Sequence, residues 1–399
     1  MNSKPFKHLE SLCAAEAKIR ITTQPHKIPL FASSAFKFES IEDGIEIFKN
    51  QPGSHVYTRY GNPTIEAVAQ KIANLEVFGS DLAAFGLLTS SGMAAIHLTI
   101  QTILKPGDSI LTQGNLYGGT TELFNKVFGP QNINIEIIDF GALDNLEQSI
   151  SNLKVQPVIF IETPTNPTLQ CIDILKVCQI VHKYKGLVIV DNTFATPVIQ
   201  QPILLGADVV IHSTTKFLHG HGVSTGGAIV TSNENLFKAI WETQKLVGSN
   251  SNTFDAWLVN IGLKTLVLRM EKQSENALQL AHYLSKHPKI NKVHYPGLPN
   301  DTNHQLAKQQ MKKFGAMLSF EVGSEYQDAI NFANRLNHCA LAPSLGETDT
   351  MVLHPASMSH LKIPIETRLK YGITDNLIRF SVGIENIEDI IDDIEQALA

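Results

Sequence analysis

The sequence predicts an α/β fold with a mostly parallel sheet, followed by a smaller C-terminal α+β domain. Between about residues 64 and 255, short apolar runs rich in β-branched residues alternate with helical patterns. Such runs are typical of strands covered on both faces, and their alternation with helices indicates parallel pairing. After residue 255, long helical patterns precede three more strand-like runs and a closing helix. We therefore divide the chain into an N-terminal arm (1–63), a main domain (64–255) and a C-terminal domain (256–399).

The elements follow in this order. The arm is irregular, with "TTQPHKIPLFASS" predicted to be extended, and the first helix, "TIEAVAQKIANLE", is predicted to begin with Thr64 as its N-cap. Strands are predicted at "DSILTQG", "INIEIIDFG", "VQPVIFIET", "GLVIVDNT", "ADVVIHST" and "GGAIVTS". The C-terminal domain is predicted to contain strands at "INKVHYPG", "GAMLSFEV" and "DNLIRFSVG" before the helix "NIEDIIDDIEQAL".

Composition narrows the class of protein. The chain has 399 residues, 43% hydrophobic and 18% charged, with a formal net charge of -6 and no long basic stripe, so we expect no nucleic-acid partner. Residues 1–20 lack the apolar core of a secretory signal, and no run of eighteen apolar residues predicts a membrane span. We expect a cytoplasmic location, because no CxxC pairing occurs among Cys13, Cys171, Cys178 and Cys339.

Polar residues follow three apolar strands. "VIFIE" is followed by "TPTNP" with Asn166, "LVIV" by Asp191, and "DVVIH" by a run that ends in Lys216. In open α/β sheets, ligands bind where the strands end at their carboxyl edge. A buried charge there is costly unless a partner compensates it. An ordinary salt bridge between Asp191 and Lys216, or solvated loop positions, is the alternative interpretation.

A helix start supplies a possible anion site. Ser91 and Gly92 precede "MAAIHLTIQTIL", and the first N–H groups of such a helix, with its dipole, favour an anion. The alternative is a plain N-cap without any ligand. Ser213 and Thr215, next to Lys216, would add hydroxyl donors for a phosphate.

Together these groups suit pyridoxal 5'-phosphate (PLP). That cofactor requires a lysine amine for covalent attachment, a carboxylate against the ring nitrogen and a phosphate site, which Lys216, Asp191 and the helix start would supply. Tyr117 in "NLYGGT" would stack on the ring, and Asn166 would bind the ring hydroxyl. Arg379, on an apolar strand, would bind a substrate carboxylate, with a structural ion pair as the alternative.

A group of three histidines offers a competing interpretation. His212, His219 and His221 lie around Lys216 and could ligate a metal ion. The loop supplies no carboxylate or thiolate partner, so we predict no metal site, and its glycines are better explained as permitting tight turns.

Beyond these residues, the sequence resembles the Cys/Met metabolism, or trans-sulfuration, PLP-dependent enzymes from about residue 28 to the end. This family includes methionine γ-lyase, cystathionine γ-lyase, cystathionine γ-synthase and the O-acylhomoserine sulfhydrylases. The resemblance rests on "YTRYGNPT" (57–64), "SSGMAAI" (90–96), "LYGGT" (116–120), "ETPTNPT" (162–168), "VDNTFATP" (190–197), "HSTTKFLHGHG" (212–222), "LRMEKQSENA" (268–277), "HPASMSH" (354–360) and "IRFSVGIE" (378–385).

The resemblance implies a fold and a set of roles. The fold would be the PLP-dependent transferase fold type I, like aspartate aminotransferase, with residues 64–255 as the PLP-binding domain. Lys216 and Tyr117 would be catalytic. Cofactor binding would involve Tyr57, Arg59, Ser91, Gly92, Met93, Tyr117, Asn166, Asp191, Ser213, Thr215 and Lys216. Tyr57 and Arg59 would reach the phosphate in a neighbouring subunit, which implies a homo-oligomer, usually a dimer of dimers. Asn166, Ser344 and Arg379 would bind the substrate carboxylate.

Within the family, the sequence carries motifs typical of two different reactions. "HPASMSH" and "SLG" at 344–346 favour a carbon–sulfur γ-lyase acting on methionine, cystathionine or homocysteine, whereas "GVSTGGAIV" is closer to the enzymes that replace the γ-group of an O-acylhomoserine. Gly119 stands where methionine γ-lyases typically carry cysteine, and Asp349 stands where the family often has glutamate. A scaffold protein without catalysis would be expected to lose Lys216 or Asp191, and both are present.

Overall fold

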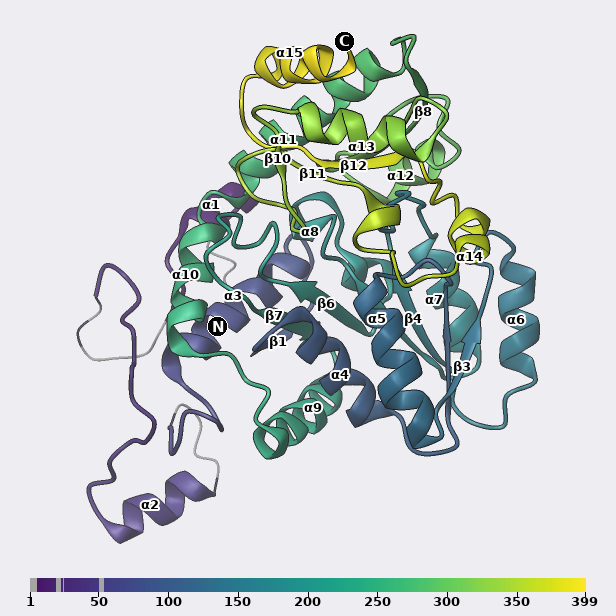
Figure 1. Ribbon diagram of the computed structural model, residues 1–399. Helices are drawn as coiled ribbons and strands as arrows, with labels where there is room; N and C mark the ends of the chain where they lie inside the picture. Colours follow the sequence, from purple (N-terminus) through teal and green to yellow (C-terminus); the bar gives the residue numbers. More distant parts are fainter. Residues whose placement is uncertain (1–5, 19–22, 24, 50–53) are drawn as a thin grey trace.

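Two sheets organise the computed structural model, which describes all residues except 1–5, 19–22, 24 and 50–53 (Figure 1). Parts of the predicted N-terminal arm therefore lie outside the described residues. The larger sheet consists of β1 (Phe85–Thr89), β2 (Ser109–Thr112), β3 (Asn134–Ile137), β4 (Val158–Glu162), β5 (Leu187–Asp191), β6 (Val209–Ser213) and β7 (Gly227–Thr231). Its order is β1-β7-β6-β5-β4-β2-β3. Pairing is parallel from β3 through β6, while β7 runs antiparallel to both neighbours, so the predicted mostly parallel sheet is confirmed.

Helices precede, connect and follow these strands along the chain. They are α3 (Pro63–Glu76), α4 (Gly92–Ile103), α5 (Gly118–Leu123), α6 (Leu143–Ser151), α7 (Ile174–Lys183), α8 (Thr196–Ile199) and α9 (Glu234–Val247), with the short helical segments η1 (Phe124–Phe128), η2 (Gly129–Gln131) and η3 (Pro202–Leu205). The prediction that Thr64 caps α3 is wrong. Asn62 is the N-cap and accepts from the Thr64 N–H, because Pro63 occupies the first helical position, where its missing N–H costs nothing.

The C-terminal region forms the second sheet, as predicted. Its elements are α10 (Thr253–Leu263), α11 (Leu266–Leu284), β8 (Ile290–His294), α12 (His304–Gln310), β9 (Met317–Val322), α13 (Tyr326–Arg335), β10 (Ala340–Leu341), β11 (Met351–Leu353), η4 (Pro355–Ser357), α14 (Ile365–Lys370), β12 (Leu377–Ser381) and α15 (Ile387–Leu398). The strand order is β10-β11-β12-β9-β8. Figure 1 shows this sheet above the larger one, with α11, α13 and α15 beside it.

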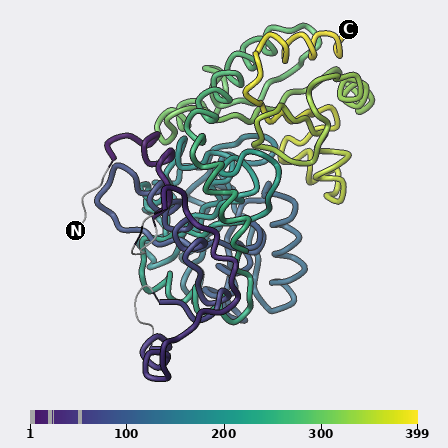
Figure 2. The backbone as a smooth tube through the Cα atoms, turned by 90° about the vertical axis from the view of Figure 1, so that its left-hand side faces the viewer, coloured from purple at the N-terminus to yellow at the C-terminus, as the bar shows by residue number. Residues whose placement is uncertain are grey.

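The N-terminal segment lies along one side of the molecule (Figure 2). It carries α1 (Leu9–Ala14) and α2 (Ile41–Phe48), and α2 projects from the body at the lower end of the view. The buried amine of Lys71 on α3 fixes the end of α1 by donating to the Cys13 and Ala15 carbonyls, each at 2.8 Å. None of the described helices is long and apolar enough to cross a lipid bilayer.

Two apolar cores fill the faces of the larger sheet. Strand side chains alternate between them: Val188 and Val190 of β5 belong to one core, and Ile189 belongs to the other. The first core includes residues of α3 and α7 and continues into β9, β12 and α15 of the second sheet. The second core includes residues of α4 and α9. Because the central strands are buried on both faces, they expose polar groups mainly at their ends.

Candidate active site

A cleft of about 1050 Å³ lies at the carboxyl ends of β4, β5 and β6. It is lined by residues at the strand ends of the larger sheet and on α4 and α5, and by C-terminal residues between 343 and 379, including Arg379 of β12. The predicted site residues gathered here are Ser91, Gly92, Met93, Tyr117, Asn166, Asp191, Ser213, Thr215, Lys216 and Arg379. Ser344 lies between two lining residues, Pro343 and Leu345. Positions far apart in the sequence therefore meet at one edge of the sheet, as the strand ends predicted.

Lys216 follows β6 and presents its amine to the C-terminal region. Its Nζ donates to Ser344 Oγ at 3.1 Å. Burial lowers the pKa of this amine, and the positive charge of Arg379 lowers it further, against a smaller opposing effect of Glu347. A lowered pKa increases the fraction of neutral amine, which is the form that acts as nucleophile or base. The salt bridge with Asp191 is not the arrangement found, because the amine is bound to Ser344.

Two carboxyl groups occupy the ends of neighbouring strands. Asp191 ends β5, and Glu162 ends β4 directly beside it in the parallel register. Asp191 Oδ1 accepts from the Thr193 N–H at 3.0 Å. Burial raises the pKa of both groups, and the charge of Asp191 raises the pKa of Glu162 further. Two carboxyls in one buried site favour a cationic partner, such as a protonated ring nitrogen.

The start of α4 retains free N–H groups. Ser91 is the N-cap of this helix, and its Oγ accepts from the Ala94 N–H at 3.0 Å. The capping role named as the alternative interpretation is therefore present. This cap leaves the N–H groups of Gly92 and Met93 without partners inside the helix. A Cβ on Gly92 would lie 2.9 Å from the Ser213 Cβ, so only glycine fits this cradle. The donor set and its tightness fit a phosphate.

The Thr215 hydroxyl has a hydrogen-bond partner in its own loop. Its Oγ1 accepts from the Gly226 N–H at 3.0 Å and lies 3.3 Å from the Gly226 carbonyl oxygen. Thr215 lines the cleft, but these contacts tie its hydroxyl to the loop before β7.

Arg379 is a buried cation, with 4% of its surface exposed. Nη1 donates to Asn166 Oδ1 at 3.2 Å, Nη2 donates to the Ser344 carbonyl at 2.8 Å, and the buried Nε has no partner within the described residues. Burial lowers its pKa to about 10. Its hydrogen-bond partners are neutral oxygens, so the structural ion pair is not what the structure contains. A guanidinium in this state fits an anionic ligand such as a carboxylate.

Tyr117 stands at the beginning of α5 with 45% of its surface exposed, in the wall of the cleft. Its N–H donates to Glu162 Oε2 at 2.8 Å. The ring lies against Gly119, where a Cβ would be 2.6 Å from the ring Cε1. A side chain at position 119 would therefore displace the ring from this position.

Tyr57 and Arg59 lie outside this cleft. They line a second, polar cavity of about 640 Å³, which shares Thr225 with the first. The Arg59 guanidinium donates to the Lys245 carbonyl and lies 4.9 Å from the centre of the Tyr60 ring. Within one chain, these two predicted cofactor ligands therefore line a different cavity from Lys216.

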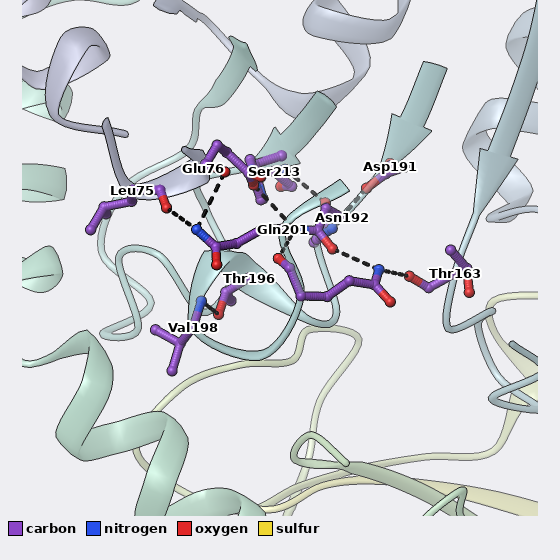
Figure 3. A network of polar contacts seen from close by, with 12 residues as sticks. Leu75, Glu76, Thr163, Asp191, Asn192, Thr196, Val198, Gln201 and Ser213 are labelled. Carbon is purple, nitrogen blue, oxygen red and sulfur yellow. Dashed lines mark hydrogen bonds and ion pairs between the residues drawn. The ribbon is translucent and has the colours of Figure 1, made fainter. Parts of the chain in front are cut away.

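Figure 3 shows a network of polar contacts in which Glu76 and Asn192 lie beside the strand ends that carry Asp191 and Ser213. His212 is fully buried and contacts Glu76 Oε1 at 2.6 Å, and the Asn192 amide donates to the same oxygen at 3.1 Å. His219 and His221 contact each other on the following loop. No group of three His, Cys, Asp or Glu side chains that could hold a metal ion occurs in the described part of the chain.

Sequence reasoning missed Glu162 and Thr193. Glu162 has a signal in the sequence, because a carboxylate ends the otherwise apolar run "VIFIE". Its contacts with the N–H groups of Tyr117 and Asn166 depend on the fold, so the signal does not reveal its role.

A lysine at the carboxyl edge of the sheet, a buried carboxylate and an anion cradle define a PLP-dependent enzyme of fold type I. The family model described as "Cys/Met metabolism PLP-dependent enzyme" matches residues 11–399, and the chain belongs to this family. Over 373 residues it is 42% identical to an L-methionine γ-lyase of Fusobacterium nucleatum subsp. polymorphum, covering 93% of each chain. Over 378 residues it is 40% identical to a cystathionine β-lyase of Lactococcus lactis subsp. cremoris, covering 94% of this chain and 95% of the relative.

A solved structure gives the same result for the fold. Cystathionine γ-synthase of Xanthomonas oryzae pv. oryzae, in complex with aminoacrylate and cysteine, superposes with a TM-score of 0.91 at 34% identity. The match covers 98% of this chain and 97% of the synthase. The relatives therefore include both lyases and a synthase.

Proposed function

We propose that the protein is a carbon–sulfur γ-lyase acting on a sulfur amino acid: methionine, cystathionine or homocysteine. The observation that carries this proposal is the contact of Lys216 and Arg379 with the same residue, Ser344. Arg379 would bind the substrate carboxylate and thereby hold the adjacent carbon beside the Lys216 amine. The methionine γ-lyase and cystathionine β-lyase relatives, both above 39% identity over most of the chain, support a lyase.

The residues that would hold PLP follow from the site. Lys216 would bind it covalently, Asp191 would pair with the ring nitrogen, Tyr117 would stack on the ring and Asn166 would bind the ring hydroxyl. The phosphate would be held by the N–H groups of Gly92 and Met93 and by the Ser213 hydroxyl, with Ser91 as the cap of α4 and Thr215 in the adjoining loop shaping the cradle around it. When bound, PLP supplies an electron-withdrawing ring that stabilises negative charge next to the substrate amine.

Two side chains would then move protons. Once the substrate amine has replaced it on the cofactor, the freed Lys216 amine, with its lowered pKa, would accept the proton from the substrate α-carbon and return it to a neighbouring atom. Tyr117, in the cleft wall near Arg379, would serve as acid or base for the sulfur-bearing end of the substrate. Asn166 would keep the Arg379 guanidinium in place throughout.

Replacement of the γ-group of an O-acylhomoserine is the second candidate. It is favoured by Gly119, against which the Tyr117 ring packs where methionine γ-lyases typically carry cysteine, and by the likeness to the Xanthomonas synthase.

One assay separates the two candidates. The purified enzyme is given methionine, cystathionine, homocysteine or O-acetylhomoserine, with and without sulfide or cysteine. A γ-lyase releases 2-oxobutanoate from at least one of the first three substrates, whereas β-cleavage of cystathionine releases pyruvate. Formation of homocysteine or a thioether from O-acetylhomoserine, with no 2-oxo acid from the other substrates, would establish γ-replacement instead.

We infer that the active enzyme is a homo-oligomer, with a dimer of dimers as the expected form, and that it works in the cytoplasm. Tyr57 and Arg59 would complete the phosphate site of a second copy, which explains why they line another cavity in their own chain. Mixing inactive Lys216→Ala and Arg59→Ala proteins should restore activity, because exchanged dimers contain one site with both residues intact. Failure of the exchanged mixture to recover activity would argue against the shared site.

A further inference from the structure

Glu162 is a buried carboxyl group that joins two segments of the cleft. It ends β4 with 6% of its surface exposed. Oε2 accepts from the Tyr117 N–H at 2.8 Å, and Oε1 accepts from the Asn166 N–H at 2.9 Å. Tyr117 is the N-cap residue before α5, whereas Asn166 belongs to the loop after β4. Both oxygens of one side chain therefore fix two backbone positions that come from different connections of the sheet.

The backbone of Glu162 is itself held from both sides. The Gln113 side-chain amide donates to the Glu162 carbonyl at 2.9 Å and accepts from the Glu162 N–H at 2.9 Å. Gln113 follows β2, which pairs with β4 in the larger sheet. The backbone from which the carboxyl group extends is thus fixed in the sheet. The positions of its two contacts are therefore determined by the sheet.

A continuous series of hydrogen bonds runs from Glu162 to the lysine. The Asn166 side chain accepts from Arg379 Nη1 at 3.2 Å, and Arg379 Nη2 donates to the Ser344 carbonyl at 2.8 Å. Ser344 Oγ in turn lies 3.1 Å from Lys216 Nζ. Glu162 therefore stands at the point where the ring-stacking residue and the substrate-binding residues are linked.

A carboxyl group is an expensive choice for this position. Burial and the neighbouring charge of Asp191 both raise the pKa of Glu162. The adjacent Gln113 illustrates that an amide can fix backbone groups without such a cost. Only a carboxylate, however, offers acceptors at both ends, since a glutamine would turn an N–H toward one of the two donors.

We propose that Glu162 is a positioning residue that sets the Tyr117 ring and the Asn166 side chain relative to each other, so that both contact the bound cofactor. The inference rests on the proposed PLP site and adds a residue to it. Glu162 acts through Tyr117 and Asn166 and makes no proton transfer of its own.

The test compares two variants of the holoenzyme. Glu162→Gln keeps the size of the side chain but can satisfy only one of the two N–H groups. The matched control is Asp393→Asn, which alters another buried carboxylate that accepts three backbone N–H groups, from Asn337, His338 and Cys339. We measure the visible circular dichroism of bound PLP, its rate of release on dilution, and thermal stability.

We expect Glu162→Gln to change the visible circular dichroism and to release PLP roughly tenfold faster. Asp393→Asn should lower thermal stability but leave both cofactor signals at the wild-type level. A Glu162→Gln protein that matches the wild type in both signals would overturn the inference. If that variant does not fold, Glu162→Asp replaces it, because the shorter side chain cannot reach both donors.

A double-mutant cycle distinguishes positioning from general support of the fold. The effect of Glu162→Gln on PLP release should persist in a Tyr117→Phe background, where the ring remains, and shrink in a Tyr117→Ala background. Equal effects in both backgrounds would contradict the proposal. A wild type that binds no PLP at Lys216 would overturn the proposed function as well, whereas normal wild-type binding with an unaffected variant overturns this inference alone.

Discussion

Glu162 in the cleft and Asp393, far along the chain, are both buried carboxyl groups that accept hydrogen bonds from backbone N–H groups. Asp393 on α15 accepts from Asn337, His338 and Cys339. Burial alone would raise its pKa, but these donors hold it below the usual range. Glu162 has two such donors and a second carboxyl group, Asp191, beside it, and its pKa is raised. The same kind of group therefore stabilises the fold at one position and carries an electrostatic cost at the other.

The two carboxyl groups differ in whether the protein itself compensates their burial. At Asp393 every feature serves stability, because the carboxylate is buried and provided with donors. In the cleft, Glu162 and Asp191 share one buried region, and Arg379 has a donor without a partner among the described residues. A ligand with groups of opposite charge would compensate these charges when it binds. Structural sites differ from binding sites in that their charges are compensated within the protein itself.

The largest expected effect is the loss of turnover when the lysine of the cleft is replaced. Lys216→Ala removes the amine that lies against Ser344, and we expect kcat to fall roughly 10²–10⁴-fold or more, because a base and an attachment point are lost together. Thermal unfolding should change little, since the amine makes a single hydrogen bond to a side chain. The measurement is steady-state turnover, with borohydride reduction and peptide mapping of the wild type. A label on another lysine would contradict the assignment.

Asp191→Asn should separate function from stability. We expect kcat to fall roughly 10²-fold or more, because the ring nitrogen loses its charged partner. The cofactor-free protein should gain on the order of 1 kcal/mol in its free energy of unfolding, because two buried carboxyls no longer repel.

The gain depends on pH. Since burial raises the pKa of Asp191 and Glu162, their stabilising contribution is complete below the unfolded pKa and is lost as pH rises through the folded pKa. The wild type should therefore lose stability toward alkaline pH more steeply than the variant. Denaturant titrations from pH 5 to about pH 9 measure this difference, and identical slopes would count against the coupled pair.

Asp393→Asn tests the stabilising side. We expect a loss of about 1–3 kcal/mol in the free energy of unfolding at neutral pH, because two or more N–H donors lose their full partner. The folded pKa of Asp393 is depressed, so its contribution is present above the unfolded pKa and disappears as pH falls through the folded pKa. The variant should be less sensitive to acid, and its kcat should stay at the wild-type value. A fall in kcat would link this carboxylate to the cleft.

The smallest expected effect separates helix capping from phosphate binding at the start of α4. Ser91→Ala removes the cap of α4 and should cost about 1 kcal/mol of stability. Because the Ser91 hydroxyl is already engaged by the Ala94 N–H, PLP affinity should change less than in a variant of Gly92 that fills the cradle. Equilibrium titration with PLP and thermal unfolding give the two quantities, and a large loss of affinity would place the hydroxyl on the phosphate instead.

Much of the fold was predictable because its strands are buried on both faces and therefore consist of β-branched runs. β1 was missed, since it carries Gly86, where a Cβ would lie 2.2 Å from the Ala69 carbonyl oxygen of α3. Close helix packing selected a residue with poor strand propensity there. The short β10 and β11 were also missed, because their pairing depends on neighbouring strands rather than on their own pattern.

The site shows the same division. Asp191 and Lys216 were predictable because a charge that ends a buried strand stands out in the sequence. Ser344 came only from the family resemblance, since its contacts with Lys216 and Arg379 join distant segments. Glu162 needed the structure, because nothing local indicates which N–H groups its oxygens meet.

The larger apolar core has a consequence for how the molecule comes apart. It includes Ile72 of α3, Val190 of β5, Phe320 of β9 and Ile394 of α15, so the two sheets share one interior. Neither half would retain a complete interior if the chain were cut between them. Heating should accordingly give a single cooperative endotherm, in which the walls of the cleft are lost at the same temperature as the rest.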